Sequence, residues 1–154
     1  MSADLQAHIE RLAQDLDVEL WLLINGDPDL DPYGEAVSDP RVVKITHAPT
    51  TLAPYMVALH ELGHHASHAW TGKTLPRLEC EALAWNWAIE NSLIEPDWNL
   101  IYARLAAYGR LADTNRRFKR TQSFTDLIVR VAALTGTDAI SVTHNGDPQK
   151  DPPS

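Results

Sequence analysis

The sequence predicts an α+β fold, in which a small N-terminal sheet is followed by a mostly helical domain. The two segments richest in strand-favouring residues both lie near the N-terminus, at 18–24 and 41–46. From about residue 50 onward, apolar residues recur at helical spacing through four successive segments. Proline and glycine separate these segments, as expected for short connections between helices.

The N-terminal third of the chain predicts one helix and two strands. Residues 3–16 predict an amphipathic helix, because their large apolar residues lie three or four positions apart. These residues are Leu5, Ile9, Leu12 and Leu16. The sequence VELWLLI at 18–24 predicts a strand, and RVVKIT at 41–46 predicts a second one. The segment 25–40 is rich in proline and glycine and is interpreted as an irregular loop.

Two long helices are predicted next. Thr50 or Thr51 can cap the first of them, which spans 50–71 and ends at Gly72. The second spans 76–95, between two prolines, and its apolar stripe includes Trp85. The turn between them predicts that the two helices run antiparallel.

Two further helices follow in the C-terminal part. Asp97 caps the first, which Gly109 closes, and the second begins at Ser123 and ends before Gly136. The last residues are polar and rich in proline. We therefore expect a single domain over 1–140 and a flexible tail over 141–154.

Charge argues against a nucleic-acid partner. The chain has 13 Lys and Arg residues against 21 Asp and Glu residues, a net charge of −8. Phosphate-binding surfaces need clustered cations. The basic cluster at 116–120 is interpreted as a solvated helix end or loop.

The sequence also predicts a cytoplasmic protein. Its one cysteine, Cys80, cannot form an intrachain disulfide, which suits a reducing compartment. Residues 1–10 lack the pattern of a signal peptide. No stretch approaches the roughly 18 uninterrupted apolar residues of a membrane span.

The strongest chemical signal is the sequence His-Glu-Leu-Gly-His at residues 60–64. On a helix, His60 and His64 lie one turn apart on one face, so their imidazoles can bind one zinc ion. The carboxylate of Glu61 can take a proton from the water that such an ion activates. Five residues therefore supply two metal ligands and a general base.

A peptidase zinc needs a third protein ligand, and the next helix offers Glu79 and Glu81. The antiparallel return brings this helix back toward the two histidines. The two carboxylates point about 160° apart, so only one can face the metal. Periodicity alone does not choose between them.

The remaining histidines are not predicted as ligands. On a straight helix His65 points away from the histidine pair, and His68 lies one turn too far along to bind the same ion. Three others are interpreted as surface residues: His8, His47 and His144.

The segment 60–64 and His68, followed by Glu-x-Glu-Ala from Glu79 and an aromatic residue at Trp85, resemble the ImmA/IrrE family of zinc peptidases. The resemblance covers roughly residues 40–96. It implies a zincin-like helical domain with one zinc ion per chain.

The resemblance also implies the third ligand and the activity. Glu79 occupies the position of the family's third zinc ligand, with Ala82 and Trp85 in register. The implied activity is that of a cytoplasmic, thermolysin-like endopeptidase acting on protein partners such as repressors, in phage, mobile-element or stress-response settings.

Two hypotheses about function follow. The first is an active zinc peptidase with a protein or peptide substrate. The second is a catalytically silent, zinc-stabilised binding or regulatory module. Glu61 favours the enzyme, because a purely structural site has no use for that carboxylate.

Overall fold

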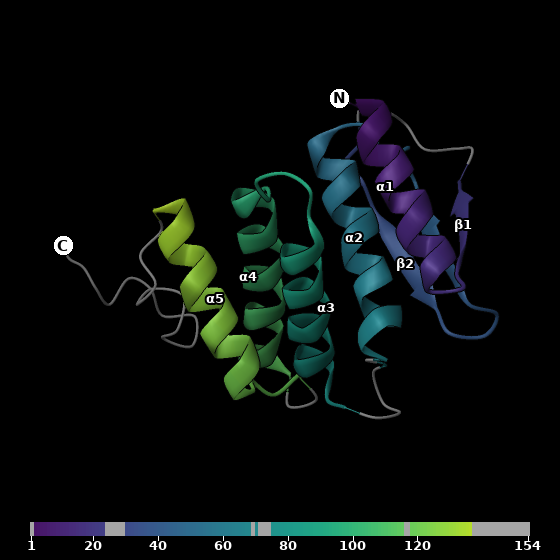
Figure 1. The fold of residues 1–154 in the computed structure, drawn as a ribbon. Helices are drawn as coiled ribbons and strands as arrows, with labels where there is room; N and C mark the ends of the chain where they lie inside the picture. Colours follow the sequence, from purple (N-terminus) through teal and green to yellow (C-terminus); the bar gives the residue numbers. More distant parts are fainter. Residues whose placement is uncertain (1, 24–29, 69, 71–74, 116–117, 137–154) are drawn as a thin grey trace. The chain divides into compact units, whose positions relative to one another are not determined.

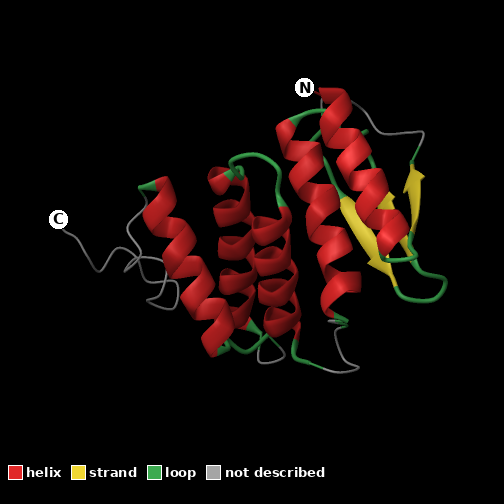
Figure 2. Ribbon diagram, viewed as in Figure 1, coloured by secondary structure: helices red, strands yellow, loops and turns green. Residues whose placement is uncertain are grey.

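The computed structural model describes residues 2–23, 30–68, 70, 75–115 and 118–136. Among them it shows five helices and one small mixed sheet, which confirms the predicted α+β class (Figures 1 and 2). The elements in chain order are α1 (Ser2–Asp15), β1 (Glu19–Leu22), β2 (Gly34–Val37), β3 (Val42–Ile45), α2 (Leu52–Ser67), α3 (Arg77–Asn91), α4 (Trp98–Thr114) and α5 (Gln122–Thr135).

The predicted loop over 25–40 was wrong in part, because it contains β2. This strand pairs antiparallel with β3, from Gly34 opposite Ile45 to Val37 opposite Val42. Four residues without strict alternation, next to several prolines, give little strand signal. The pairing with β3 stabilises this strand, although the local sequence alone does not indicate it.

Three predicted helix ends also needed correction. α2 ends at Ser67, because His68 adopts a left-handed conformation (φ 53°) and caps the helix through its backbone N–H. α3 ends at Asn91, before the predicted limit at Pro96. α4 does not end at Gly109 but continues to Thr114. The predicted end of α5 at Gly136 is confirmed by its left-handed cap.

The chain divides into two compact units. Unit 1 comprises the described residues within 1–69 and 83–97, and unit 2 those within 70–82 and 98–154. The single domain over 1–140 stays a prediction, and the predicted tail lies outside the described residues. No helix among the described residues has the length and apolar character to span a bilayer.

Unit 1 is built around the sheet, whose strand order is β1–β3–β2. β1 runs parallel to the central strand β3, and β2 runs antiparallel to it. α1 contacts β1 and α2, while α2 contacts β2 and β3 (Figure 1). Residues 55–65 of α2 are all buried, although five of them are polar or titratable. These five are Tyr55, His60, Glu61, His64 and His65.

Unit 2 packs α4 against α5. Its core includes Ile101, Leu105, Phe124, Leu127 and Ile128. The basic cluster at 116–120 is not simply a solvated segment. Arg120 donates hydrogen bonds to the carbonyl of Gly109 and to Asp113, both at 3.1 Å. Arg116 and Arg117 lie outside the described residues.

Candidate metal centre

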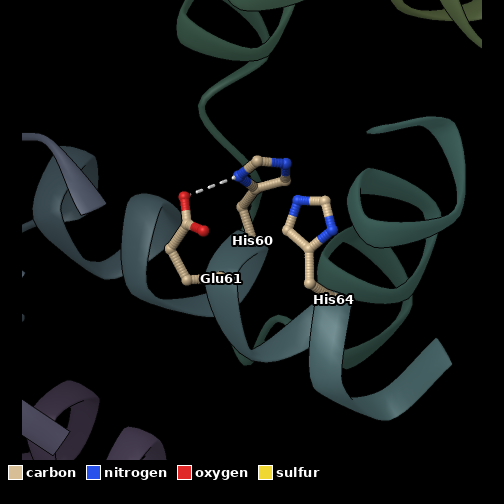
Figure 3. Close-up of side chains that lie close together, drawn as sticks. All are labelled: His60, Glu61 and His64. Carbon is tan, nitrogen blue, oxygen red and sulfur yellow. Dashed lines mark hydrogen bonds and ion pairs between the residues drawn. The ribbon is translucent and has the colours of Figure 1, made fainter. Parts of the chain in front are cut away.

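The motif at 60–64 lies within α2, as predicted, and is almost fully buried. His60, Glu61 and His64 are 7%, 7% and 8% exposed. Figure 3 shows the two imidazoles rising from neighbouring turns of the helix, with Glu61 beside His60. Burying three titratable side chains costs free energy unless they find hydrogen-bonding or ionic partners. This group would therefore destabilise the folded state if it served only as core packing.

The donor atoms of this group converge. One ligand atom from each of His60, Glu61 and His64 lies within 4.8 Å of the others. The two imidazole ring centres are 4.8 Å apart, with their planes at 69°. Imidazole is a ligand type that zinc prefers, so the two histidines fit the ion that the sequence predicts.

A contact joins the imidazole of His60 to the carboxylate of Glu61. Nδ1 of His60 lies 3.2 Å from Oε2 of Glu61. Because a carboxylate only accepts hydrogen bonds, Nδ1 carries the proton in this contact. The contact holds the carboxylate of Glu61 beside the ring of His60.

Two glycines allow neighbouring elements to approach the motif closely. A Cβ added at Gly34 of β2 would lie 2.8 Å from Cγ of Glu61 and 3.0 Å from Val57. One added at Gly63 would lie 2.4 Å from the carbonyl oxygen of Ala84 in α3. No local pattern in the sequence indicates the approach at Gly34, because it depends on β2.

Trp85 of α3 packs directly on the site. Its side chain is fully buried, as the predicted apolar stripe requires. The indole stacks on the imidazole of His60, with ring centres 4.1 Å apart and planes 15° from parallel. Helical spacing predicted that Trp85 is buried but could not show which residue it covers.

α3 also carries both carboxylates proposed for the third ligand. Glu79 is partly exposed, whereas Glu81 is 3% exposed, with Oε2 3.8 Å from Nε of Arg77. Glu81 is one turn before Trp85 and therefore on the same side of the helix. Glu79 is six residues before Trp85 and is rotated from it by about 120°. Both carboxylates lie in unit 2, so the choice of Glu79 stays a prediction.

Two other histidines are structural. Nε2 of His65 lies 3.0 Å from the carbonyl oxygen of Val42, which ties α2 to β3. Burial is the largest influence on its imidazole and lowers the pKa of His65. The prediction that His8 is a surface residue was wrong. It is 7% exposed, because α1 packs on α2, and its Nδ1 lies 2.8 Å from the hydroxyl of Tyr55.

Cys80 is buried, and its thiol lies 3.7 Å from the carbonyl oxygen of Leu75. His68, by contrast, is exposed at the end of α2. Among the described residues, the group that could hold a metal ion is therefore His60, Glu61 and His64.

Comparisons of the chain with protein-family models, curated proteins and solved structures found no match.

Proposed function

We propose that this protein is a cytoplasmic zinc-dependent endopeptidase that hydrolyses peptide bonds of a protein partner. The observation that carries the proposal is the buried group of His60, Glu61 and His64 on one helix, with their ligand atoms within 4.8 Å. Two imidazoles alone would suit a structural site. The adjacent carboxylate adds the general base that hydrolysis requires.

The roles of the residues follow from their chemistry. His60 and His64 would hold the zinc through ring nitrogens, together with a carboxylate from α3. Zinc in such a site polarises a carbonyl group and lowers the pKa of water to about 7. Glu61 would accept a proton from the attacking water at a carboxylate oxygen and pass it to the leaving amine.

The position of β2 supports a peptide as substrate. β2 is an edge strand, paired on one side with β3, and Gly34 lies against Glu61. The register and the bond from the Thr46 N–H to the Tyr33 carbonyl oxygen direct the backbone groups of Gly34 and Ala36 away from β3. An extended peptide can hydrogen-bond to such an edge, which would bring it beside the proposed base.

Two residues of α3 are candidates for the third zinc ligand, and different arguments favour each of them. The family resemblance implies Glu79. Burial and helix phase favour Glu81, because it shares a side of α3 with Trp85, which stacks on His60. The choice leaves the roles of His60, His64 and Glu61 unchanged.

The substitution Glu61→Gln tests the proposal. Glutamine keeps the shape and the hydrogen bonding of glutamate but cannot accept the proton. We expect one zinc per chain in both proteins and a loss of cleavage of about 10²–10⁴-fold in the variant. The substrate is sought among proteins that co-purify with the variant, which are then incubated with wild-type protein.

The same experiment separates the enzyme from the catalytically silent module. Equal complementation of a cellular phenotype by the wild type and Glu61→Gln would show that catalysis is not the function. A wild-type protein that binds no zinc after dialysis against it would overturn both hypotheses. The repressor-like targets implied by the family are the first partners to test.

A further inference from the structure

We propose that Trp85 is a positioning residue that holds the imidazole of His60 in the orientation required for zinc binding. This inference rests on the proposed function, because it assigns a role toward the same ion. The observation behind it is the stack of the indole on the imidazole, with ring centres 4.1 Å apart and planes 15° from parallel.

A stacked indole restrains the imidazole without blocking it. A metal ion binds an imidazole nitrogen in the plane of the ring, whereas Trp85 covers the face of the ring. The terminal torsion of histidine is broad, so an unrestrained ring can turn its nitrogen away from an ion. On its other side, Nδ1 of His60 contacts Glu61 at 3.2 Å. The stack restrains a face of the His60 ring, and this contact restrains one of its edges.

The chemistry of the indole also fits a metal-bound histidine. Binding to a dication withdraws electron density from an imidazole and makes its face more positive. The face of tryptophan attracts positive charge more strongly than that of any other side chain. The stack is therefore expected to strengthen when zinc is bound, and to favour the loaded state.

Packing alone does not account for tryptophan at this position. Trp85 is fully buried, and its indole N–H has no hydrogen-bond partner among the described residues. An unsatisfied buried N–H destabilises the folded state. Phenylalanine would fill most of this space without that cost, but it offers a smaller and weaker face to His60.

The test compares the zinc affinities of two Trp85 variants with that of the wild type, using chelator competition. Trp85→Leu removes the stack, and we expect it to weaken zinc binding by about 10–100-fold, as for other groups that orient a metal ligand. Trp85→Phe keeps an aromatic face and should restore most of the affinity. Phe124→Leu, which shortens a fully buried aromatic residue in α5, is the matched control and should bind zinc like the wild type.

Tryptophan fluorescence supplies a second readout. Zinc added to the metal-free wild type should change the emission, and Trp85→Phe should lose most of that change. Wild-type affinity in Trp85→Leu, or equal losses in Trp85→Leu and Phe124→Leu, would overturn the positioning role. Either result leaves the proposed function intact, whereas a wild type that binds no zinc would remove both.

Discussion

At the scale of single residues, the candidate site depends on how closely β2 approaches Glu61. Gly34 has no side chain, and its backbone lies against the side chain of Glu61. A methyl group there would meet Cγ of Glu61 at 2.8 Å and a methyl group of Val57 at 3.0 Å. The added Cβ would also lie 3.3 Å from the carbonyl oxygen of Lys44 in β3, the strand with which β2 pairs. The Glu61 side chain must therefore shift.

We expect Gly34→Ala to reduce peptide cleavage by about 10²-fold, since a displacement of about 1 Å can have that effect on a reacting group. Zinc content should stay at the wild-type value, because His60 and His64 are untouched. The measurement is the cleavage rate and zinc content of the variant beside Glu35→Ala, an exposed neighbour on the same strand. Equal rates in all three proteins would show that the approach of Gly34 does not set the position of Glu61 for cleavage.

At the scale of secondary-structure elements, the α2–α3 contact depends on Gly63. Its Cα lies against the backbone of Ala84, so an added Cβ would be 2.4 Å from a carbonyl oxygen. A backbone atom cannot rotate aside as a side chain can. Gly109 in α4 offers a comparison, because its added Cβ would instead meet the end of the Arg120 side chain at 3.3 Å.

We expect Gly63→Ala to lower the free energy of unfolding by about 1–3 kcal/mol or more, because the two helices must separate. Gly109→Ala should change it by less, because the gain in helix propensity of about 1 kcal/mol offsets a small shift of Arg120. Chemical denaturation of the metal-free proteins measures both. Similar losses in the two variants would show that the α2–α3 contact is not close.

A hydrogen-bonded chain connects α1, α2 and the segment after α3. Tyr55 of α2 contacts Nδ1 of His8 at 2.8 Å, and its hydroxyl accepts a hydrogen bond from the Leu93 N–H at 2.9 Å. Burial, and secondarily the charge of Arg11, lowers the pKa of His8 below its ordinary value of 6.5. The unfolded chain therefore takes up this proton at a higher pH than the folded chain does.

It follows that the His8 contribution to stability is complete above about pH 6.5 and is lost as the pH falls through the lower folded pKa. We expect the unfolding free energy of the metal-free wild type to fall more steeply between pH 7 and 5 than that of His8→Asn. Asparagine can hydrogen-bond to Tyr55 but does not titrate. The lowered pKa of His65 acts in both proteins and cancels from the comparison. Parallel curves would contradict the assignment to His8.

Sequence patterns predicted the elements whose signals are local and missed those that depend on distant contacts. Helical periodicity placed α1, α2 and α5, and β-branched residues placed β3. β2 was missed because its pairing with β3 defines it. Gly109 was interpreted as a helix end, since sequence cannot show that Arg120 packs against it.

The same distinction between local and distant contacts applies to the candidate site. Five consecutive residues specify two ligands and a base at helical spacing, so the group on α2 follows from the sequence alone. The stack of Trp85 on His60 and the approach of Gly34 to Glu61 join residues about 25 positions apart, and no periodicity encodes them. Periodicity does not choose between Glu79 and Glu81, and the third ligand stays a prediction.

At the scale of the whole molecule, zinc binding and folding should be coupled. The group on α2 is buried in the folded chain, and an unfolded chain does not hold two histidines and a carboxylate together. Zinc at about 100 times its Kd then adds about 2.7 kcal/mol to the unfolding free energy. For a chain of this length, that corresponds to a rise of about 5–10 °C in Tm.

The rise in Tm on zinc binding can be used to identify the third ligand, because a variant that lacks a zinc ligand loses this rise. We expect Glu81→Gln to lose most of it and Glu79→Gln to keep it, since Glu81 is buried and shares a side of α3 with Trp85. Glu81 also lies beside Arg77, so its replacement will change the Tm of the metal-free protein as well. The quantity to compare is therefore the rise in Tm that zinc causes within each variant, with His60→Ala as the control variant that must lose this rise.

The opposite pattern, in which Glu79→Gln loses the rise and Glu81→Gln keeps it, would assign the ligand to Glu79, as the family resemblance implies. A full rise in both variants would show that α3 supplies no carboxylate to the ion, and the zinc would then need a different third ligand from the one proposed.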